Sequence, residues 1–183
     1  RQQLRKNFNM LGSFSWKLIE DLTFKSEFGL DNRNNQDYRF YGRSTYYVSN
    51  TPSALNQGSP ALIIGDQKIT TFRNANTLNY DFKKLLSENH HFNILAGQEM
   101  INTKSNSITS TIHKFPNDFD FYQAQKLTSQ GIAQSVDNFY SPEDKLLSFF
   151  GRANYDYKNK DLLTATFRAD GSSKFTEGNQ WGY

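Results

Sequence analysis

The side chains best suited to metal chemistry in this sequence are its three histidines, because the chain contains no cysteine. His90 and His91 are adjacent, so in an extended segment they point to opposite faces, and His113 stands in a separate, loop-like stretch. The lack of cysteine also excludes disulfides, thiolate ligands and cysteine nucleophiles. A shared histidine site would require a coincidence of folding, so the sequence predicts neither a metal site nor a cofactor.

Two acidic pairs are the other candidates for catalysis, and both lie in predicted turns or loops. Neither Glu20-Asp21 nor Glu143-Asp144 has the positioned partner that general acid–base catalysis needs. The sequence holds no glycine-rich phosphate loop and no serine nucleophile elbow. The DGSS stretch at 170–173 lacks the repeated acidic spacing of a Ca²⁺ loop and is better explained as a turn or strand bend. We expect a protein that is not an enzyme.

The charge of the chain is nearly balanced, with 21 basic and 18 acidic residues. Lysine and arginine are spread along the sequence and form no continuous basic stripe. Nucleic-acid binding requires such a stripe or patch to neutralise the phosphates. The sequence therefore predicts no nucleic-acid partner.

The elements that must position these side chains are predicted to be β-strands. Six segments alternate between apolar and polar residues, and almost no segment carries a helical period. They group into three hairpins with short turns. The paired segments are 8–18 with 22–30, 71–82 with 91–100, and 147–157 with 163–170.

The connections between the hairpins are predicted to be long, from about Asn32 to Lys68 and from about Asn102 to Asp144. They contain all four prolines and most of the serine and asparagine runs. Short turns at one rim and long loops at the other are typical of outer-membrane barrels. The composition agrees, since 36% hydrophobic but 15% aromatic residues suit a wall with a polar lumen face.

We therefore predict an all-β fold, an antiparallel up-and-down transmembrane β-barrel segment of about six strands in three hairpins. Six strands cannot close a membrane barrel, and open strand edges are not tolerated in lipid. The segment is thus expected not to close on its own and to belong to a longer protein. The alternation alone fits a soluble β-sandwich almost as well, so a carbohydrate-binding or interaction module is the alternative. A porin-like or adhesin barrel without energy coupling is a third possibility.

Four charged residues of the last hairpin fall on the polar side of the alternation. An arginine at the middle of the lipid face would cost roughly 2–4 kcal/mol. We therefore predict that these charges face the lumen and form a ladder across the strands. Gly151, on the opposite face, is predicted to let a neighbouring aromatic ring lie over the strand. The four charges are Arg152, Asp156, Arg168 and Asp170.

Two groups of aromatic residues have predicted roles. Trp16, Tyr155 and Tyr157 fall near the short-turn ends of their strands, where a girdle meets the membrane–water boundary. Others cluster in the long connections, where they either contact substrate or a lid protein or simply pack a loop against itself. A helical turn is expected within 118–125. The loop aromatics are Tyr38, Tyr41, Tyr46, Tyr47, Phe119, Phe121 and Tyr122.

The last third of the chain resembles a known family. Residues 148–157, SFFGRANYDY, resemble the SYFGRxNYxY strand of SusC/RagA-type TonB-dependent transporters, and 162–175, LLTATFRADGSSKF, are similar to the family's YLLTATxRADGSSRF signature. GNQWGY at 178–183 resembles the start of GNRWGYFPS. Weaker echoes of two further family hairpins occur at 76–99 and at 16–28, the latter with Asp21 where glycine is usual.

This resemblance implies that residues 1–183 are a partial TonB-dependent transporter β-barrel domain, with the plug domain and the remaining strands outside the sequence. It implies location in the cell outer membrane, in contact with outer-membrane lipid, and uptake of a glycan or peptide substrate. Family members work with a SusD-like surface lipoprotein and are energised by the TonB complex, which here would act through parts of the protein that the sequence lacks.

Overall fold

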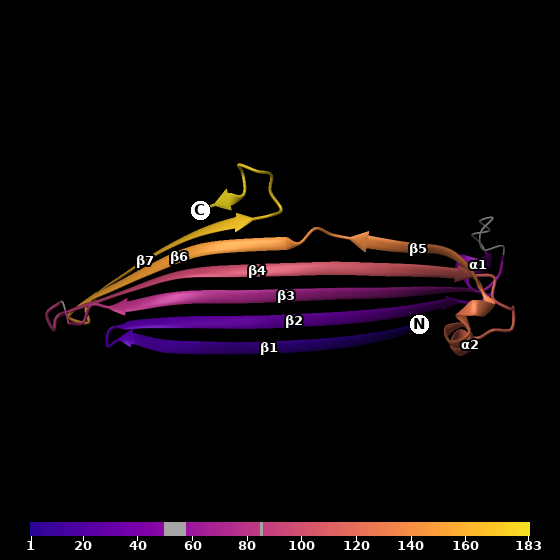
Figure 1. Ribbon diagram of the computed structural model, residues 1–183, viewed down its shortest axis with the longest axis horizontal. Coiled ribbons are helices and arrows are strands. Elements are labelled where there is room, and N and C mark those ends of the chain that lie inside the picture. The colour runs from indigo at the N-terminus through magenta and orange to yellow at the C-terminus, as the bar shows by residue number, and fades with distance from the viewer. Residues whose placement is uncertain (50–57, 85) are drawn as a thin grey trace. The chain divides into compact units, whose positions relative to one another are not determined.

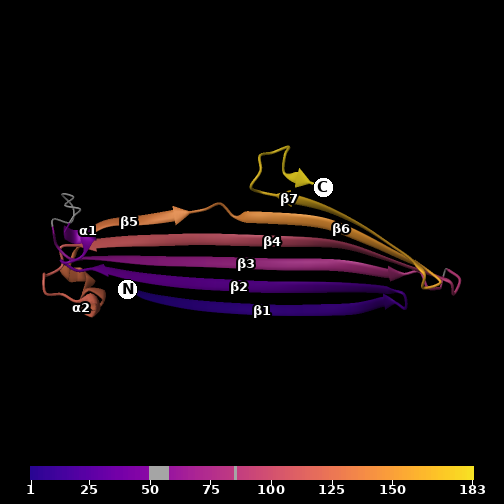
Figure 2. The ribbon, with the colours of Figure 1, turned by 180° about the vertical axis from the view of Figure 1, so that it is seen from behind.

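The computed structural model describes residues 1–49, 58–84 and 86–183. Eight strands form one sheet in the order β1-β2-β3-β4-β6-β7-β8, and β5 pairs separately with β4 (Figures 1 and 2). Within the described residues, no helix is long and apolar enough to cross a membrane. The strands are β1 (Gln2–Ile19), β2 (Leu22–Tyr41), β3 (Ala61–Asp81), β4 (His90–His113), β5 (Ile132–Tyr140), β6 (Asp144–Tyr157), β7 (Asp161–Ser172) and β8 (Trp181–Gly182). The short helices are α1 (Tyr46–Ser49), α2 (Phe121–Lys126) and the 3-10 turn η1 (Thr128–Gln130).

The predicted all-β, antiparallel, up-and-down and unclosed sheet is confirmed. All six expected strands are present, and the structure adds the short strands β5 and β8. All the described strands belong to one sheet, whereas the β-sandwich alternative requires two sheets that face one another.

The tight turn between β6 and β7 shows how local sequence sets the hairpin. Lys158 and Asn159 have left-handed backbones, with φ of 54° and 55°, as a type I′ turn requires at its two central positions. The N–H of Lys160 donates to the carbonyl of Tyr157 at 3.0 Å. The side chain of Asp156 accepts from the N–H of Asn159 at 2.7 Å. These bonds fix the register that pairs β6 with β7 along their full length.

The expectation of long loops between the hairpins is wrong where strands extend into the predicted connections. β2 continues to Tyr41, β3 begins at Ala61, and β4 continues to His113. Strands persist there because backbone pairing does not require an apolar face, and polar side chains bridge neighbouring strands. Gln36 donates to Asp66 at 3.1 Å, for example. Residues 50–57 of the first predicted connection, including Pro52, lie outside the described residues.

The chain divides into two compact units, and β1 to β4 each contribute to both. Unit 1 comprises Arg1–Phe8, Asn32–Ile69 and Ser105–Ser141, and unit 2 comprises Asn9–Asp31, Thr70–Lys104 and Pro142–Tyr183. β1 and β4 are 18 and 24 residues long, roughly twice the 9–11 residues that cross a bilayer at a tilt. β6 and β7, which lie wholly in unit 2, have 14 and 12 residues. β6 and β7 are thus long enough to cross a bilayer.

Unit 1 has a small core of its own around Leu62, Phe115 and Ala124. The helix α2 overlaps the helical turn expected at 118–125. It packs into this core through Ala124 and begins with a capping box. The carboxylate of Asp120 accepts from the N–H of Gln123 at 2.8 Å, and the side chain of Gln123 returns a bond to the N–H of Asp120. Partly buried residues packed against the core are Phe40, Ile64, Ile112 and Phe119.

Candidate functional site

The candidate site is the pair of faces that the strands of unit 2 present. Alternate side chains of a strand point to opposite faces, and the observed contacts fix which positions go together. Phe28 lies over Gly12, and Asn74 donates to Ser26, so these residues share one face. We call this the apolar face, and the other the polar face. Large exposed side chains of the apolar face are Met10, Phe14, Trp16, Leu18, Phe28, Phe72, Leu78, Ile94, Met100, Leu147, Phe149, Leu163 and Phe167.

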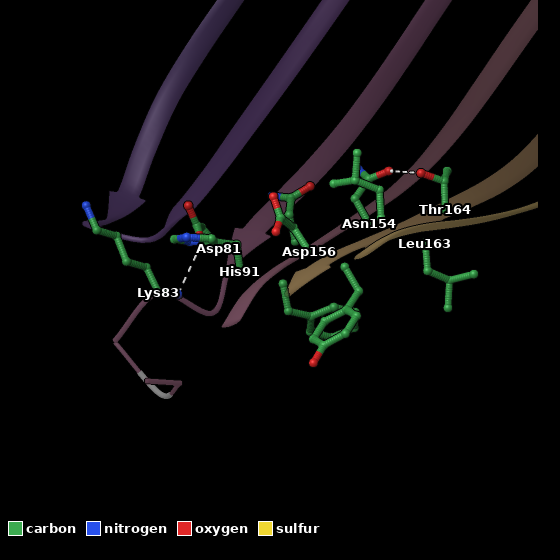
Figure 3. Close-up of a pocket in the computed structure, with 11 residues that line it drawn as sticks. Asp81, Lys83, His91, Asn154, Asp156, Leu163 and Thr164 are labelled. Atoms are coloured by element: carbon green, nitrogen blue, oxygen red, sulfur yellow. Dashed lines mark hydrogen bonds between the residues drawn. The ribbon is translucent and has the colours of Figure 1, made fainter. Parts of the chain in front are cut away.

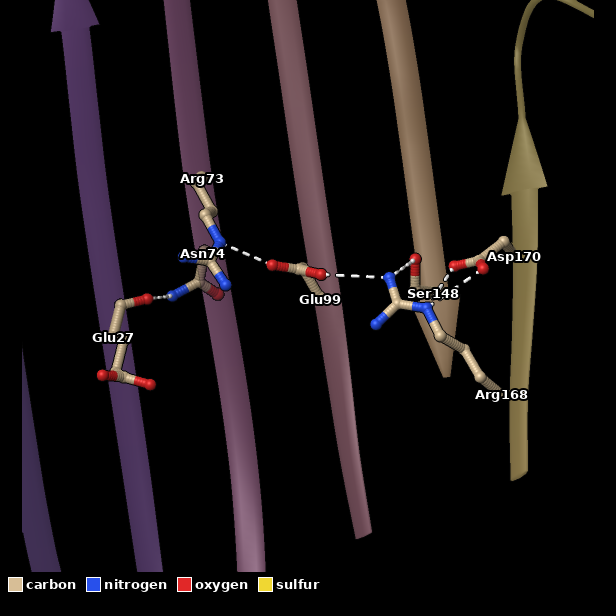
Figure 4. A network of polar contacts seen from close by, with 7 residues as sticks. All are labelled: Glu27, Arg73, Asn74, Glu99, Ser148, Arg168 and Asp170. Carbon is tan, nitrogen blue, oxygen red and sulfur yellow. Dashed lines mark hydrogen bonds and ion pairs between the residues drawn. The ribbon is translucent and has the colours of Figure 1, made fainter. Parts of the chain in front are cut away.

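The polar face carries a connected charge network that runs over four strands (Figure 4). Glu99 of β4 lies between Arg73 of β3 and Arg168 of β7, and it forms an ion pair with each. Arg168 also donates to Ser148 of β6 at 3.0 Å and to both oxygens of Asp170, at 2.9 and 3.0 Å. We define Arg73, Glu99, Ser148, Arg168 and Asp170 as the charge network. Two positive and two negative charges make it neutral.

The middle of the charge network is its most enclosed part. Glu99 is only 7% exposed, and Ser148 is fully buried. Hydrogen bonds between ionised groups are shorter and stronger than neutral ones, so the charge network holds β3, β4, β6 and β7 in one arrangement. The guanidinium of Arg168 also lies 5.7 Å from the centre of the Phe150 ring on the same face. Every charged side chain of the charge network therefore has a partner of opposite charge on the polar face.

The structure brings together two of the four charges predicted from the last hairpin. Arg168 and Asp170 are members of the charge network. Arg152 instead makes a long contact with Thr166 at 3.4 Å, and Asp156 serves the β6–β7 turn. Sequence reasoning missed Arg73, Glu99 and Ser148, although the alternation placed all three on polar sides. Their contact depends on the register between strands, which the sequence pattern does not specify.

An aromatic cluster lies on the apolar face at the short-turn ends of β3, β4 and β6. The His90 Nδ1 and the Tyr155 hydroxyl are 2.6 Å apart, and the His90 and Tyr157 rings are 4.8 Å apart. Of the three residues predicted for a membrane boundary, Tyr155 and Tyr157 are in this cluster, and Trp16 is exposed near the short-turn end of β1. The aromatic cluster consists of Tyr80, Phe82, His90, Phe92, Tyr155 and Tyr157.

A hollow of about 290 Å³ lies at the same ends of the strands (Figure 3). Asp81, His91 and Asp156 line it from β3, β4 and β6, and Thr164 of β7 donates to Asn154 at 3.1 Å. His91 and Asp156 face one another in the strand register. Within the described residues, no group of three or more histidine and acidic side chains is arranged to hold a metal ion.

The predicted role of Gly151 is wrong, because no ring lies over it. A side chain added there would meet only the carbonyl of Leu95, at 3.7 Å. An aromatic ring does lie over three other glycines: Phe28 covers Gly12, Phe150 covers Gly97, and Trp181 covers Gly171. Gly97 pairs directly with Phe150, and Gly171 with Trp181, so the ring crosses to the facing strand. These pairs, too, depend on register.

The predicted loop aromatics fall into packed and exposed groups. Tyr41 stacks on Tyr47 with ring centres 4.4 Å apart, and Phe119 packs against the core of unit 1. Tyr46 of α1 and Tyr122 of α2 are 76% and 66% exposed. Tyr38 lies within β2, in a stretch predicted to be a loop, and Phe121 packs edge-on against Tyr122. Tyr46 and Tyr122 therefore remain the loop aromatics best placed to contact another molecule.

Both acidic pairs are engaged by lysines. Lys84 forms ion pairs with Glu20 and Asp21, and Lys104 pairs with Glu143 at 2.7 Å. The hydrogen bonds from Lys84 and Lys104 lower the pKa of Glu20 and of Glu143 respectively, so these carboxylates stay ionised. Carboxylates held in this way are poor general acids or bases at neutral pH.

His113 is a titratable group whose environment the sequence did not reveal. It ends β4 opposite Ile132 and is only 3% exposed. Within the described residues, neither nitrogen of its ring has a hydrogen-bond partner. Burial lowers the pKa of His113, because an apolar environment disfavours the charged ring.

Comparison with known proteins identifies relatives by sequence and by fold. The chain is 30% identical over 175 residues to the TonB-dependent receptor P39 of Formosa agariphila, covering 92% of this chain and 15% of that protein. It is 49% identical over 43 residues to the TonB-dependent receptor SusC of Bacteroides thetaiotaomicron, covering 24% of this chain and 4% of that protein. No protein-family model matches the chain.

Among solved structures, the RagAB peptide transporter matches this chain with a TM-score of 0.80 and 22% sequence identity. The superposition covers 98% of this chain and 19% of the transporter chain. This likeness shows the barrel fold. The chain thus spans less than a fifth of the relatives it matches. The motifs of the last hairpin, the unclosed antiparallel sheet and these matches together show that the chain matches a fragment of the β-barrel of SusC/RagA-type TonB-dependent receptors.

Proposed function

We propose that this chain forms part of the wall of a TonB-dependent importer in the outer membrane, which takes up glycan or peptide fragments together with a surface lipoprotein. The observation that carries the proposal is the contrast between the faces of unit 2. One face exposes large apolar side chains, and the other holds the neutral charge network. A wall between lipid and an aqueous lumen requires this contrast.

Energetics support this orientation. An arginine at the midplane of the lipid face costs roughly 2–4 kcal/mol, so Arg73 and Arg168 favour the lumen. A large exposed apolar surface in water marks an interaction site or a membrane contact. The aromatic cluster supplies amphipathic rings for the boundary at the short-turn ends. Trp16, Tyr155 and Tyr157 are therefore proposed to lie at that boundary.

Unit 1 is proposed to lie in the external aqueous phase. It has a small apolar core of its own, formed by Leu62, Phe115 and Ala124. Tyr46 and Tyr122 are exposed there and are suited to stack on a sugar or to pack against a substrate peptide or lid protein. The solved structural neighbour RagAB is a peptide transporter, and this supports the peptide class of substrate.

The test uses the full-length receptor that contains this chain. Membranes are washed with carbonate and then extracted with detergent, and the extract is analysed for a co-purifying lipoprotein. Uptake of fluorescent oligopeptides and oligosaccharides is measured in cells with and without a functional TonB complex. We expect extraction by detergent alone, a lipoprotein partner, and TonB-dependent uptake of one of the two substrate classes. Release by carbonate, or uptake that is independent of TonB, would contradict the proposal.

The loop aromatics provide a finer test of the same proposal. Tyr46→Ala and Tyr122→Ala, made as single variants, should each raise the substrate concentration for half-maximal uptake about two- to tenfold. This is the loss expected for one or two aromatic contacts. Tyr140→Ala is the matched control, since Tyr140 is equally exposed in unit 1 but lies on β5. An equal effect of all three variants would remove Tyr46 and Tyr122 from the binding surface.

A further inference from the structure

β5 is an edge strand of unit 1. It pairs with β4 on one side, and no described strand pairs with its other side (Figure 1). β7, the strand next to β6, ends at Ser172, where the chain turns back to form β8. The pairing with β4 shifts register between Thr111 and Ile112, so the regular part of β5 runs from Ser135 to Tyr140. We call the unpaired side of residues 135–140 the free edge.

The backbone of the free edge is suited to pair with a further strand. In an antiparallel pair, alternate residues turn their N–H and C=O groups away from the partner strand, and at an edge these groups face outward. Proteins commonly protect such edges with lysine, proline or inward-pointing charges. Residues 135–140 contain no lysine and no proline, and Asp137 is their one charged residue. Its carboxylate accepts from Ser135 of the same strand at 3.0 Å. The sequence therefore leaves the free edge open to an added strand.

Large apolar side chains flank the free edge on both faces of β5. Val136 and Tyr140 lie on one face and Phe139 on the other, because alternate residues point to opposite faces. These side chains are 67%, 72% and 69% exposed. Unit 1 is proposed to lie in water, where neighbouring exposed apolar side chains mark a surface that binds another molecule. An added strand would place its own side chains beside them as cross-strand pairs.

We propose that the free edge binds a substrate peptide of about six residues as an added β-strand. The inference rests on the transport function proposed above and narrows its substrate to the peptide class. A polypeptide in extended form carries N–H and C=O groups at the spacing of the free edge, whereas a glycan has no such ladder. Because the main chain supplies the hydrogen bonds, binding depends little on any single side chain of β5.

The test measures binding to the full-length receptor purified in detergent, where it does not depend on the TonB complex. The probe is a fluorescent hexapeptide of alternating valine and threonine, N-methylated at every second residue. One edge of this peptide keeps its N–H groups, and the blocked edge prevents aggregation. The matched control is the same hexapeptide with every residue N-methylated. We expect fluorescence polarisation to show at least about tenfold weaker binding of the control, from the loss of about three backbone hydrogen bonds.

Crosslinking and substitutions locate the bound peptide. A probe with a diazirine in place of one valine side chain should form its adducts on the peptide that contains residues 132–140. Of the neighbouring residues Val136 and Asp137, one points its N–H toward β4 and the other toward the free edge. Val136→Pro and Asp137→Pro each remove one of these donors, and the variant in which the α2 amides keep their protection from hydrogen exchange is the one altered at the free edge. That variant should bind the probe at least about tenfold more weakly, whereas Tyr140→Ala, which keeps the backbone, should bind it within about twofold.

Failure of the probe to bind, or equal binding of the probe and the fully methylated control, would overturn this inference. Adducts outside residues 132–140, or unchanged binding in the proline variant altered at the free edge, would also overturn it. The transport proposal fails on different evidence. TonB-dependent uptake together with any of these results would leave transport standing with another mode of substrate binding, and probe binding at β5 without TonB-dependent uptake would contradict transport alone.

Discussion

At the residue scale, the polar face is organised around Glu99. Its carboxylate is nearly buried and accepts from two arginines on different strands, so one side chain ties β3 to β7 across β4. Ser148 and Asp170 then orient Arg168 from β6 and β7. Because removing a shared acceptor leaves two charged donors without it, Glu99 should be the most costly member to lose.

Replacing Glu99 with alanine should lower the free energy of unfolding of the full-length receptor by about 1–3 kcal/mol. The arginines are partly exposed and can rehydrate, which keeps the cost below that of a fully buried pair. Glu27→Gln is the control, because the Lys25–Glu27 pair is about half exposed on both sides, and it should cost less than about 1 kcal/mol. Urea unfolding in vesicles measures both. Equal losses in the two variants would show that the charge network stabilises the receptor no more than an exposed ion pair does.

A second residue-scale prediction concerns the ring over Gly97. A methyl group there would collide with the ring of Phe150, so Gly97→Ala should destabilise the barrel by about 1–3 kcal/mol. Gly151→Ala, on the next strand, meets only a carbonyl at 3.7 Å and should change stability by less than about 1 kcal/mol. Phe150→Leu combined with Gly97→Ala should recover stability. The same loss in both alanine variants would mean that glycine acts there through the backbone alone.

At the scale of elements, β4 ends in unit 1 at a buried histidine, His113. Burial lowers the pKa of His113, so the folded protein resists protonation that the unfolded chain accepts near its ordinary value of 6.5. The unfolded state therefore binds more protons as the pH falls below about 6.5, and unit 1 loses stability there, by at most about 1.4 kcal/mol per pH unit.

Hydrogen exchange of the α2 amides in the full-length receptor should report this loss. Their protection, corrected for the intrinsic pH dependence of exchange, should fall between pH 7.5 and 5.5. His113→Phe should make the protection independent of pH, whereas His91→Phe, in unit 2, should leave the profile of the native receptor. A pH profile that survives in His113→Phe would assign the effect to another group.

The strands of unit 2 were predictable because a half-buried wall imposes strict alternation. The aromatic and apolar residues at 8–18 and 147–157 repeat every second position, and strands occur at both places. In unit 1 the strands carry polar residues on both faces, as at Asn35 and Gln36, so alternation fails although the backbone pairs. β8 has only two residues, and both β5 and β8 are set by pairing with distant strands, so they escaped prediction.

The site was predictable only within one hairpin. Arg168 and Asp170 are two residues apart on one strand, so their contact can be predicted from the local sequence. Glu99 and Arg168 are 69 positions apart. Their contact needs the register of β4 on β6 and of β6 on β7, which backbone hydrogen bonds and turn geometry set. His113 was likewise assigned to a loop, because a buried core around a few loop residues leaves no periodic signal.

At the scale of the whole molecule, the sheet ends at β1 on one side and at the two-residue strand β8 beside β7 on the other. In a bilayer, strand edges must be paired, so the receptor needs further strands beside β1 and β7. The relative P39 is long enough to contain such strands, since this chain matches only 15% of its length. The proposed importer thus depends on the faces that this segment contributes and on strands from the rest of the receptor.

The most direct measurement compares two neighbouring phenylalanines of β6. Phe149→Cys and Phe150→Cys are introduced singly into the full-length receptor, labelled with an environment-sensitive fluorophore and reconstituted in vesicles. Nitroxide-labelled lipids should quench the probe at 149 and aqueous iodide the probe at 150, and this alternation should continue along 147–156. Quenching by iodide at both positions, or no alternation along the strand, would contradict a barrel wall with its apolar face in lipid.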